Sequence, residues 1–218
     1  MRQNKQIIQI SVDGGGATGT STGGKMISKK YKLKFLSSGL LYRYASYLLI
    51  KHKPKNKISF LKKEFVKLNY DKLNNLNLHN AEISQQSASI AKINKIRNIL
   101  KKFQLKFAKK YKRCCIEGRD ISTKILPNSD LKFFFKCNLN IASYRRYKEL
   151  KKRSNKINLK DVKKALRIRN NHDIQRKNSP LRKHIDAIEI DTGKLNKQAM
   201  LTKMSKYIDQ MIKKKYGN

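Results

Sequence analysis

The chain has 218 residues and a formal net charge of +39, and 39% of its residues are hydrophobic. This length and composition suffice for one globular domain with a buried core, and no apolar run approaches the roughly 20 residues that a membrane span needs. A strand is expected so near the N-terminus that no signal peptide would precede it, which predicts a cytoplasmic protein without a membrane partner.

The positive charge has a compositional explanation that needs no polyanionic partner. The 41 lysines and 19 asparagines are spread along the chain, and AT-rich codons specify both residue types. An obligatory nucleic-acid partner is therefore not expected, since charge runs alone are weak functional evidence. The 12 arginines are more informative, because a guanidinium binds phosphate or carboxylate in a bidentate geometry that lysine cannot match.

The strongest single stretch is Ile7–Lys25, IIQISVDGGGATGTSTGGK. An apolar strand leads into a glycine- and hydroxyl-rich turn, and a helix over Met26–Tyr31 is expected to follow. Such a turn points backbone N–H groups inward at the positive end of a helix dipole, which predicts a phosphate-binding loop. Gly14 and Gly19 have the spacing of the pattern G-x-x-x-x-G-K-[ST], but Thr20 occupies the lysine position.

The next segments alternate between strand and helix patterns. A strand at Lys34–Leu36 precedes a helix at Leu40–His52, for which Ser38 is the expected N-cap. The lysine- and asparagine-rich stretch 53–80 is weakly periodic, with a helical piece at Phe60–Leu68, and is interpreted as an insertion. The spacing of Ile90, Ile93, Ile96, Leu100, Phe103 and Phe107 predicts one long helix over residues 83–112, with Arg97 off its buried stripe.

The second half of the chain completes an α/β pattern. Gly118-Arg119-Asp120 follows the third expected strand. Opposite charges at the carboxyl end of a parallel strand favour a binding cleft over the alternative of a turn with a local ion pair, since exposed pairs stabilise little. The remaining expected elements are strands at 114–117, 131–137 and 185–190 and helices from 140, over 159–168 and over 195–213. Five strands interleaved with helices predict a three-layer sandwich with a five-stranded parallel sheet.

Other catalytic or metal-binding patterns are missing from the sequence. The cysteines Cys114, Cys115 and Cys137 lie in apolar segments without metal-ligand spacing, which predicts buried, reduced thiols. The four histidines are scattered, and they form neither a metal-ligand pair nor part of a serine-histidine-aspartate arrangement.

Taken together, the segments resemble bacterial cytidylate kinase, a nucleoside monophosphate kinase of the P-loop class. The resemblance runs through nearly the whole chain, in the segments VDGGGATGTST (12–22), LSSGLLYR (36–43), SASIAKINKIR (87–97), EGRDISTKILPNSDLKFFF (117–135), YRRYKEL (144–150), RNNHDIQRKNSPL (169–181) and IDAIEIDT (185–192). It implies one kinase domain over 1–218, with an NMP-binding insertion at about 53–96 and a lid at about 144–160.

The resemblance also implies an activity in pyrimidine nucleotide metabolism. The γ-phosphoryl group of ATP would pass to CMP or dCMP with the help of Mg²⁺, and a monomer is expected. The implied ATP-binding residues are Gly14, Gly15, Gly16, Ala17, Thr18, Gly19, Thr20, Ser21 and Thr22, with Ser21 or Thr22 on the metal. The implied CMP-binding residues are Ser38, Tyr42, Arg43, Arg97, Arg119, Asp120, Arg169, Asp173 and Arg176, and the arginines nearest the transferring phosphate are Arg119 and the lid residues Arg145 and Arg146.

Several positions depart from the family pattern and leave two alternatives open. Thr20 removes a cation from the β- and γ-phosphates, Ser37 replaces a usual aspartate, and Ala88 and His172 replace a serine and an arginine. These departures allow a related kinase with another acceptor. They also allow a catalytically impaired paralogue that binds nucleotide or nucleic acid through its charge, which would show as steeply salt-dependent RNA binding.

Overall fold

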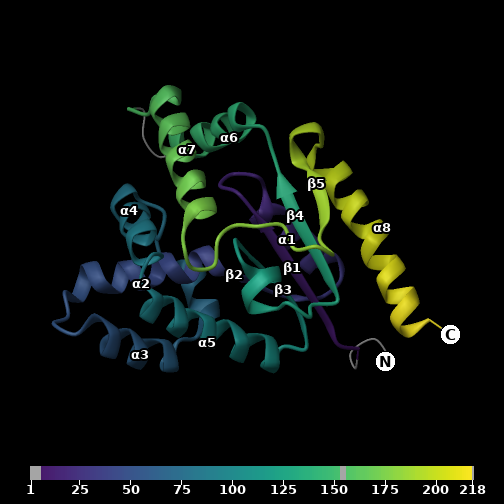
Figure 1. Cartoon of the computed structure of the whole chain (residues 1–218), viewed down its shortest axis with the longest axis horizontal. Coiled ribbons are helices and arrows are strands. Elements are labelled where there is room, and N and C mark those ends of the chain that lie inside the picture. The colour runs from purple at the N-terminus through teal and green to yellow at the C-terminus, as the bar shows by residue number, and fades with distance from the viewer. Residues whose placement is uncertain (1–5, 153–155, 218) are drawn as a thin grey trace. The chain divides into compact units, whose positions relative to one another are not determined.

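The computed structural model describes residues 6–152 and 156–217 (Figure 1). The chain divides into two compact units: Met1–Leu36 with Tyr111–Asn218, and Ser37–Lys110. The first unit contains the β-sheet, and the second consists of helices. No described helix combines the length and the apolar character that a membrane crossing requires.

The sheet of the first unit has five strands in the order β2-β3-β1-β4-β5. Their bounds are β1 (Ile8–Gly14), β2 (Lys34–Ser37), β3 (Arg113–Gly118), β4 (Leu131–Lys136) and β5 (Ile188–Asp191). The central strand β1 pairs in parallel with β3 and β4, and β4 pairs in parallel with β5. The predicted α/β class with a five-stranded parallel sheet is confirmed.

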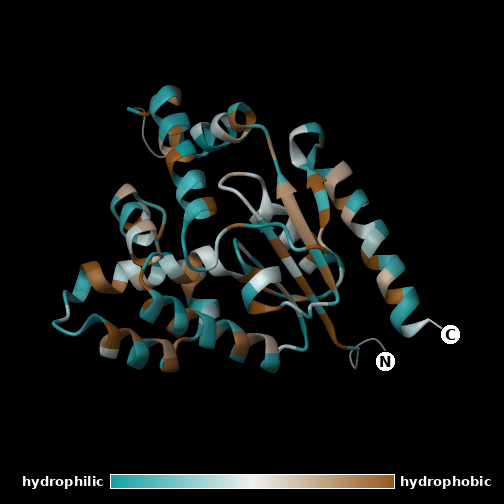
Figure 2. Ribbon diagram, in the orientation of Figure 1, coloured by the Kyte–Doolittle hydropathy of each residue, from teal (hydrophilic) through white to brown (hydrophobic). Residues whose placement is uncertain are grey.

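One face of this sheet is apolar because alternate β1 side chains point to it. Ile8, Ile10 and Val12 are fully buried and belong to a cluster with residues of two helices, Ile27 of α1 and Met204 of α8. Figure 2 shows hydrophobic colours along the strands. The helices of this unit are α1 (Thr20–Lys30), α6 (Leu139–Lys151), α7 (Leu159–Gln175) and α8 (Lys197–Tyr216).

The β1 side chains Ser11 and Asp13 are polar and contact the segment that follows β3, and the backbone of Gln9 also reaches it. Ser11 Oγ lies 3.0 Å from Ser129 Oγ, and the backbone N–H of Gln9 donates to Asp130 Oδ2 at 2.8 Å. Strand β1 thus has an apolar face toward the helices and a polar face toward residues 121–130.

The second unit contains four α-helices and a short 3-10 helix among its described residues. They are α2 (Ser38–His52), α3 (Lys57–Lys67), the 3-10 helix Tyr70–Asn75, α4 (Ala81–Ile90) and α5 (Asn94–Lys110). Helix α2 packs against α4, and α3 packs against α5. The insertion predicted at about 53–96 falls within this unit, whose bounds are wider.

The single helix predicted over residues 83–112 is wrong, because the chain forms α4 and α5 with a break at residues 91–93. Ile90 and Ile96 are buried, whereas Ile93 in the break is 42% exposed. The apolar residues keep a spacing of three through the break, so periodicity alone did not reveal it. Arg97 is also buried, at 8% exposure, because its Nη1 donates to the carbonyl of Ala91 at 3.2 Å in the break.

Several element ends also differ from prediction. Helix α7 continues to Gln175 instead of ending at Ile168. Ser37, not Ser38, caps α2, and its Oγ accepts from the N–H of Leu40 at 3.3 Å. Helix α1 begins at Thr20 instead of Met26, and Gly23 in its first turn lies close to the Phe135 ring, where a Cβ would be 2.7 Å from Cζ. The fifth strand is Ile188–Asp191.

The cysteine prediction holds for the two adjacent residues of β3. Cys114 and Cys115 are buried and free, and burial raises the pKa of the Cys114 thiol to about 12. Burial also raises the pKa of Cys115. Cys137 is free but only half-buried.

Candidate active site

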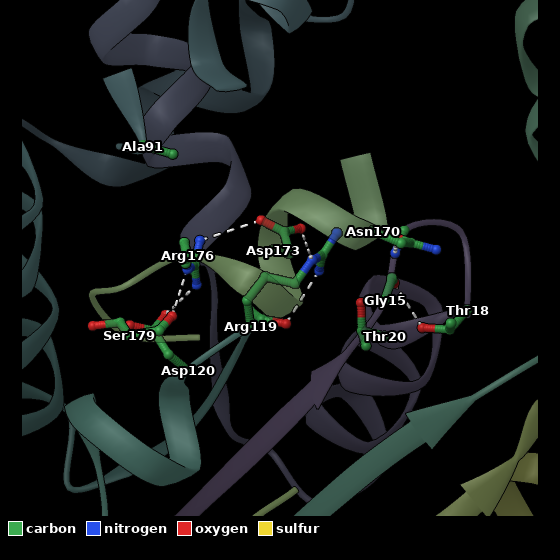
Figure 3. A network of polar contacts seen from close by, with 12 residues as sticks. Gly15, Thr18, Thr20, Ala91, Arg119, Asp120, Asn170, Asp173, Arg176 and Ser179 are labelled. Carbon is green, nitrogen blue, oxygen red and sulfur yellow. Dashed lines mark hydrogen bonds and ion pairs between the residues drawn. The ribbon is translucent and has the colours of Figure 1, made fainter. Parts of the chain in front are cut away.

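The glycine-rich loop joins β1 to α1 at the carboxyl end of the central strand. Gly19 has a φ of 95° and is the N-cap of α1, so its left-handed conformation turns the chain into the helix. Ala17 has a φ of 58°, which is uncommon for a residue with a side chain. Thr18 stabilises the turn by donating from Oγ1 to the carbonyl of Gly15 at 2.9 Å (Figure 3).

The first two hydroxyls of α1 bind one carboxylate at the end of β3. Thr20 Oγ1 donates to Glu117 Oε2 at 2.9 Å, and Ser21 Oγ donates to Glu117 Oε1 at 3.0 Å. Glu117 is 3% exposed and lies beside β1 in the sheet, paired with Val12. Glu117 was not among the predicted site residues, although an acid that ends an apolar strand beside the loop was the available signal.

The hydroxyl and carboxylate oxygens of Ser21 and Glu117 form a donor set that suits Mg²⁺, which prefers hard oxygen ligands. Thr22, the other predicted metal residue, is half-buried on the next position of α1. Among the described residues no group of three or more histidine, cysteine, aspartate or glutamate side chains could hold a metal ion. Ser21 and Glu117 would therefore supply only some of the oxygen ligands that a Mg²⁺ needs.

Helix α7 reaches the glycine-rich loop through a side chain that the sequence analysis missed. Asn170 Oδ1 accepts from the N–H of Gly16 at 2.8 Å (Figure 3). A Cβ on Gly16 would lie 2.6 Å from Leu166 Cδ1, which shows how closely α7 packs on the loop. The residues Asn170 and Leu166 are one helical turn apart, so they share a face of α7.

A cluster of two arginines and two aspartates lies after β3 and near the C-terminal end of α7. Asp173 joins the two arginines: it accepts from Arg119 Nε at 3.1 Å and from Arg176 Nη1 at 3.2 Å (Figure 3). Arg176 Nη2 also lies 3.8 Å from Asp120 Oδ1. We call Arg119, Asp120, Asp173 and Arg176 the Arg–Asp cluster. The structure thus brings together the predicted segments that contain Arg119 and Asp173, two bonded residues that are 54 positions apart in the sequence.

Arg169 lies on the same helix as Asp173 and is half-buried. The pKa of its guanidinium is lowered to about 10, mainly by burial and also by the positive charges of Arg119 and Arg146, while the carboxylates of Asp173 and Glu117 act in the opposite direction. Among the described residues, no hydrogen bond or ion pair to the Arg169 guanidinium is found. A half-buried cation whose pKa stays lowered despite the nearby Asp173 and Glu117 carboxylates is in an electrostatic setting that favours a bound anion.

The predicted lid arginines lie on α6 and have partners in the structure. Arg145 Nη2 donates to the carbonyl of Thr192 at 2.7 Å, and Thr192 Oγ1 in turn donates to the carbonyl of Thr18 at 2.6 Å. Arg146 Nη1 donates to Glu149 Oε2 at 2.8 Å. Arg145 is therefore linked through Thr192 to the glycine-rich loop, whereas Arg146 forms a pair within its own helix.

The other four predicted CMP residues belong to the second unit. Arg43 is 8% exposed, and its Nη1 donates to the carbonyl of Leu78 at 3.0 Å and to Ser84 Oγ at 2.8 Å. The Arg97 guanidinium lies 5.8 Å from the centre of the Tyr42 ring, within the range of a cation–π contact. Ser38 is the first residue of α2 and is 5% exposed.

The fold and the loop define the class of protein. A glycine-rich loop between a central parallel strand and a helix, with an acid on the adjacent strand that binds the helix hydroxyls, is the arrangement of P-loop phosphotransferases. The Arg–Asp cluster adds guanidinium groups of the kind that bind phosphate.

Comparisons with known proteins identify the family within this class. The family model for cytidylate kinase matches residues 10–210. The chain is 35% identical to a cytidylate kinase of Rickettsia africae over 211 residues, which covers 95% of this chain and 94% of the relative. It is 34% identical to a cytidylate kinase of Bartonella tribocorum over 209 residues, which covers 94% and 95%.

The chain therefore belongs to the cytidylate kinase family and is a phosphotransferase. A solved structure, TT1252 from Thermus thermophilus, covers 94% of this chain and 98% of its own length with a TM-score of 0.51. Its sequence identity is 12%, so this likeness concerns the fold alone. The family resemblance found in the sequence is confirmed, and the roles of the individual site residues remain predictions.

Proposed function

We propose that this chain transfers the γ-phosphoryl group of ATP to CMP or dCMP and releases ADP with CDP or dCDP. The observation that carries the proposal is the Arg–Asp cluster, because it joins the two segments that the resemblance assigns to the acceptor nucleotide. Asp173 orients Arg119 and Arg176 at 3.1 and 3.2 Å. Oriented guanidinium groups can bind a nucleoside monophosphate with a fixed geometry.

The glycine-rich loop is the proposed ATP site. Its backbone N–H groups and the N-terminus of α1 would bind phosphate oxygens, and Ser21, whose hydroxyl donates to Glu117, would hold Mg²⁺. When bound, Mg²⁺ supplies charge neutralisation at the phosphates of ATP. Thr20 cannot add the positive charge of the usual lysine, and in the structure its hydroxyl is engaged by Glu117. We propose that neighbouring cations compensate for this missing charge.

The acceptor side needs positioning more than acid–base chemistry. A monophosphate oxygen is already anionic, so it can attack a phosphoryl group without a strong general base. Arg119, Arg169 and Arg176 are the proposed binders of the CMP phosphate and ribose, with Asp120 and Asp173 near the sugar or base. Ser38, Tyr42, Arg43 and Arg97 are retained as CMP-binding proposals because they match the family motif.

The proposal includes a lid formed around Arg145 and Arg146. Water that reached the γ-phosphate would hydrolyse ATP without product, so a kinase of this class has to exclude water during transfer. The two arginines would add positive charge to the transferring phosphoryl group. The proposed enzyme is a cytoplasmic monomer that needs no nucleic acid.

A coupled assay that detects ADP tests this proposal with ATP, Mg²⁺ and either CMP or dCMP. Turnover of CMP or dCMP is expected, with slower reactions of UMP and AMP measured side by side. The control is the Arg176→Ala variant, checked for folding by circular dichroism, which should lose most of the activity. Folded wild-type protein that turns over neither CMP nor dCMP would contradict the proposal.

A further inference from the structure

Asp13 is a buried carboxylate between the two halves of the candidate site, and neither the motif analysis nor the family resemblance assigned it a role. It occupies the penultimate position of β1, directly before the glycine-rich loop, and its exposure is 0%. In the sheet it pairs with Gly118, the residue before Arg119.

The Asp13 carboxylate accepts three hydrogen bonds from two consecutive residues. Oδ1 accepts from the N–H of Ile121 at 2.8 Å, and Oδ2 accepts from the N–H and the Oγ of Ser122 at 2.7 and 2.6 Å. These residues begin the π-helical turn Ile121–Ile125, whose N-cap is Asp120. Asp13 therefore holds the beginning of the turn that immediately follows Arg119 and Asp120.

A carboxylate at this depth is costly unless hydrogen bonds compensate for the loss of water. Burial raises the pKa of Asp13 to about 6, although the bonds from Ser122 and Ile121 act in the opposite direction. The polar residue two positions earlier, Ser11, meets Ser129 with a single hydroxyl contact at 3.0 Å. On the same face of β1, Asp13 therefore makes three hydrogen bonds where Ser11 has one hydroxyl contact.

We propose that Asp13 is a positioning residue that sets the location of Arg119 and Asp120 relative to the glycine-rich loop. Both oxygens are needed, since one receives the Ile121 amide and the other receives Ser122. An asparagine would keep the size but offer one acceptor oxygen, and its NH₂ group would face an N–H donor. This inference rests on the proposed transfer from ATP to CMP, because Arg119 and Asp120 are acceptor residues in that proposal.

The experiment compares Asp13→Asn, Ser122→Ala and the control Ser11→Ala in the same kinase assay, with ATP and CMP each varied. For Asp13→Asn we expect kcat/KM for CMP to fall by between about tenfold and a hundredfold, because small misplacements of positioning groups cost that much. The Kd of ATP, measured by calorimetry without CMP, should change less than about threefold. Ser122→Ala removes one bond of three and should give a smaller fall of the same kind.

Ser11→Ala separates positioning from stability, because it removes a buried polar contact of the same strand whose partner is Ser129 and not one of residues 119–122. It should lower the melting temperature but leave kcat/KM for CMP within about twofold of wild type. Equal losses for Asp13→Asn and Ser11→Ala, or unchanged kcat/KM for Asp13→Asn, would overturn the inference. If Asp13→Asn does not fold, the same comparison is made with Ser122→Ala, and an unchanged kcat/KM there would overturn it.

The wild-type measurement separates this inference from the proposed function. If the wild-type protein does not phosphorylate CMP, the proposed function fails. The inference is then tested by measuring the affinity of wild type and Asp13→Asn for CMP by calorimetry. In that case a weaker CMP affinity of Asp13→Asn, with ATP affinity retained, supports the inference, and equal CMP affinities overturn it.

Discussion

The glycine-rich loop and the Arg–Asp cluster are both expected to bind phosphate, but they are built from different groups. The loop, residues 14–22, contains no lysine or arginine and offers backbone N–H groups and hydroxyls. The cluster contains two arginines held by two aspartates, with Asp173 bonded to both Arg119 and Arg176. In the loop, geometry comes from the backbone, whereas in the cluster it comes from paired charges.

This difference determines which substitutions each region tolerates. Backbone amides bind phosphate only when the chain has the right course, so the loop should be most sensitive to added side-chain bulk. Paired side chains lose their orientation when one partner is removed, so the cluster should be most sensitive to loss of a charge. The four predictions below test this contrast, from the largest expected effect to the smallest.

Removal of Asp173 should have the largest effect, because its carboxylate orients two arginines. Truncation of one partner in a desolvated charge pair costs about 2 to 5 kcal/mol, so Asp173→Ala should lower kcat/KM for CMP by at least about thirtyfold. The matched control is Glu189→Gln, which breaks the exposed Lys136–Glu189 pair at 2.6 Å and should be nearly neutral. Similar kinetics for the two variants would show that the cluster is not a binding site.

The charge on Asp13, which links the two regions, should appear in the pH dependence of stability. Its pKa is raised from 3.8 to about 6 by burial, so the folded state holds the proton more tightly than the unfolded state. Protonated Asp13 therefore stabilises the folded state. This stabilisation is fully present below about pH 4, and the unfolding free energy falls by about 3 kcal/mol as the pH rises through 6.

Urea unfolding of wild type and Asp13→Asn at several pH values measures this contribution, because the other titrating groups largely cancel in the difference. The unfolding free energy of wild type minus that of the variant should decrease between pH 4 and pH 7. A difference that is flat, or that increases, would show that the hydrogen bonds from Ile121 and Ser122 outweigh burial.

A methyl group added to the loop should destabilise the protein to different extents at two glycines. A Cβ on Gly14 would lie 2.7 Å from the Phe135 carbonyl oxygen, which is backbone and cannot move easily. A Cβ on Gly16 would meet Leu166 Cδ1, the end of a flexible side chain. Gly14→Ala should therefore cost about 1 to 3 kcal/mol of unfolding free energy, and Gly16→Ala should cost less. Thermal melts of the two variants provide the comparison, and the reverse order would contradict it.

The smallest effect is expected from a new charge in the loop. A lysine at position 20 would meet the Glu117 carboxylate that now accepts from Thr20. We therefore expect Thr20→Lys to change kcat/KM for ATP by less than about tenfold, or about 1.4 kcal/mol. Thr20→Met, of comparable length without charge, is the control. A rise of several hundredfold in Thr20→Lys would instead show that the wild-type loop lacks a cation it needs.

Much of the fold and part of the site could be predicted because the signals are local. The apolar run of β1, the glycine spacing after it and the Gly118-Arg119-Asp120 segment each depend on neighbours in the sequence. The break between α4 and α5 could not be predicted, since Ile90, Ile93 and Ile96 keep helical spacing across it. Asn170 was missed because only the folded chain brings α7 to the loop. Glu117 was missed although it ends an apolar strand and opens the segment 117–135.

By itself the sequence determined the family, the α/β class and the segments that carry glycines, hydroxyls and arginines, because these depend on residue type and spacing. Only the tertiary structure decided which of these groups meet. Asp173 joins Arg119 to Arg176, Glu117 binds Thr20 and Ser21, and Asp13 holds the turn after Asp120. Apart from the local Asp173–Arg176 bond, each contact joins separate parts of the chain through strand register or helix packing, and such pairing has no signature in a single sequence.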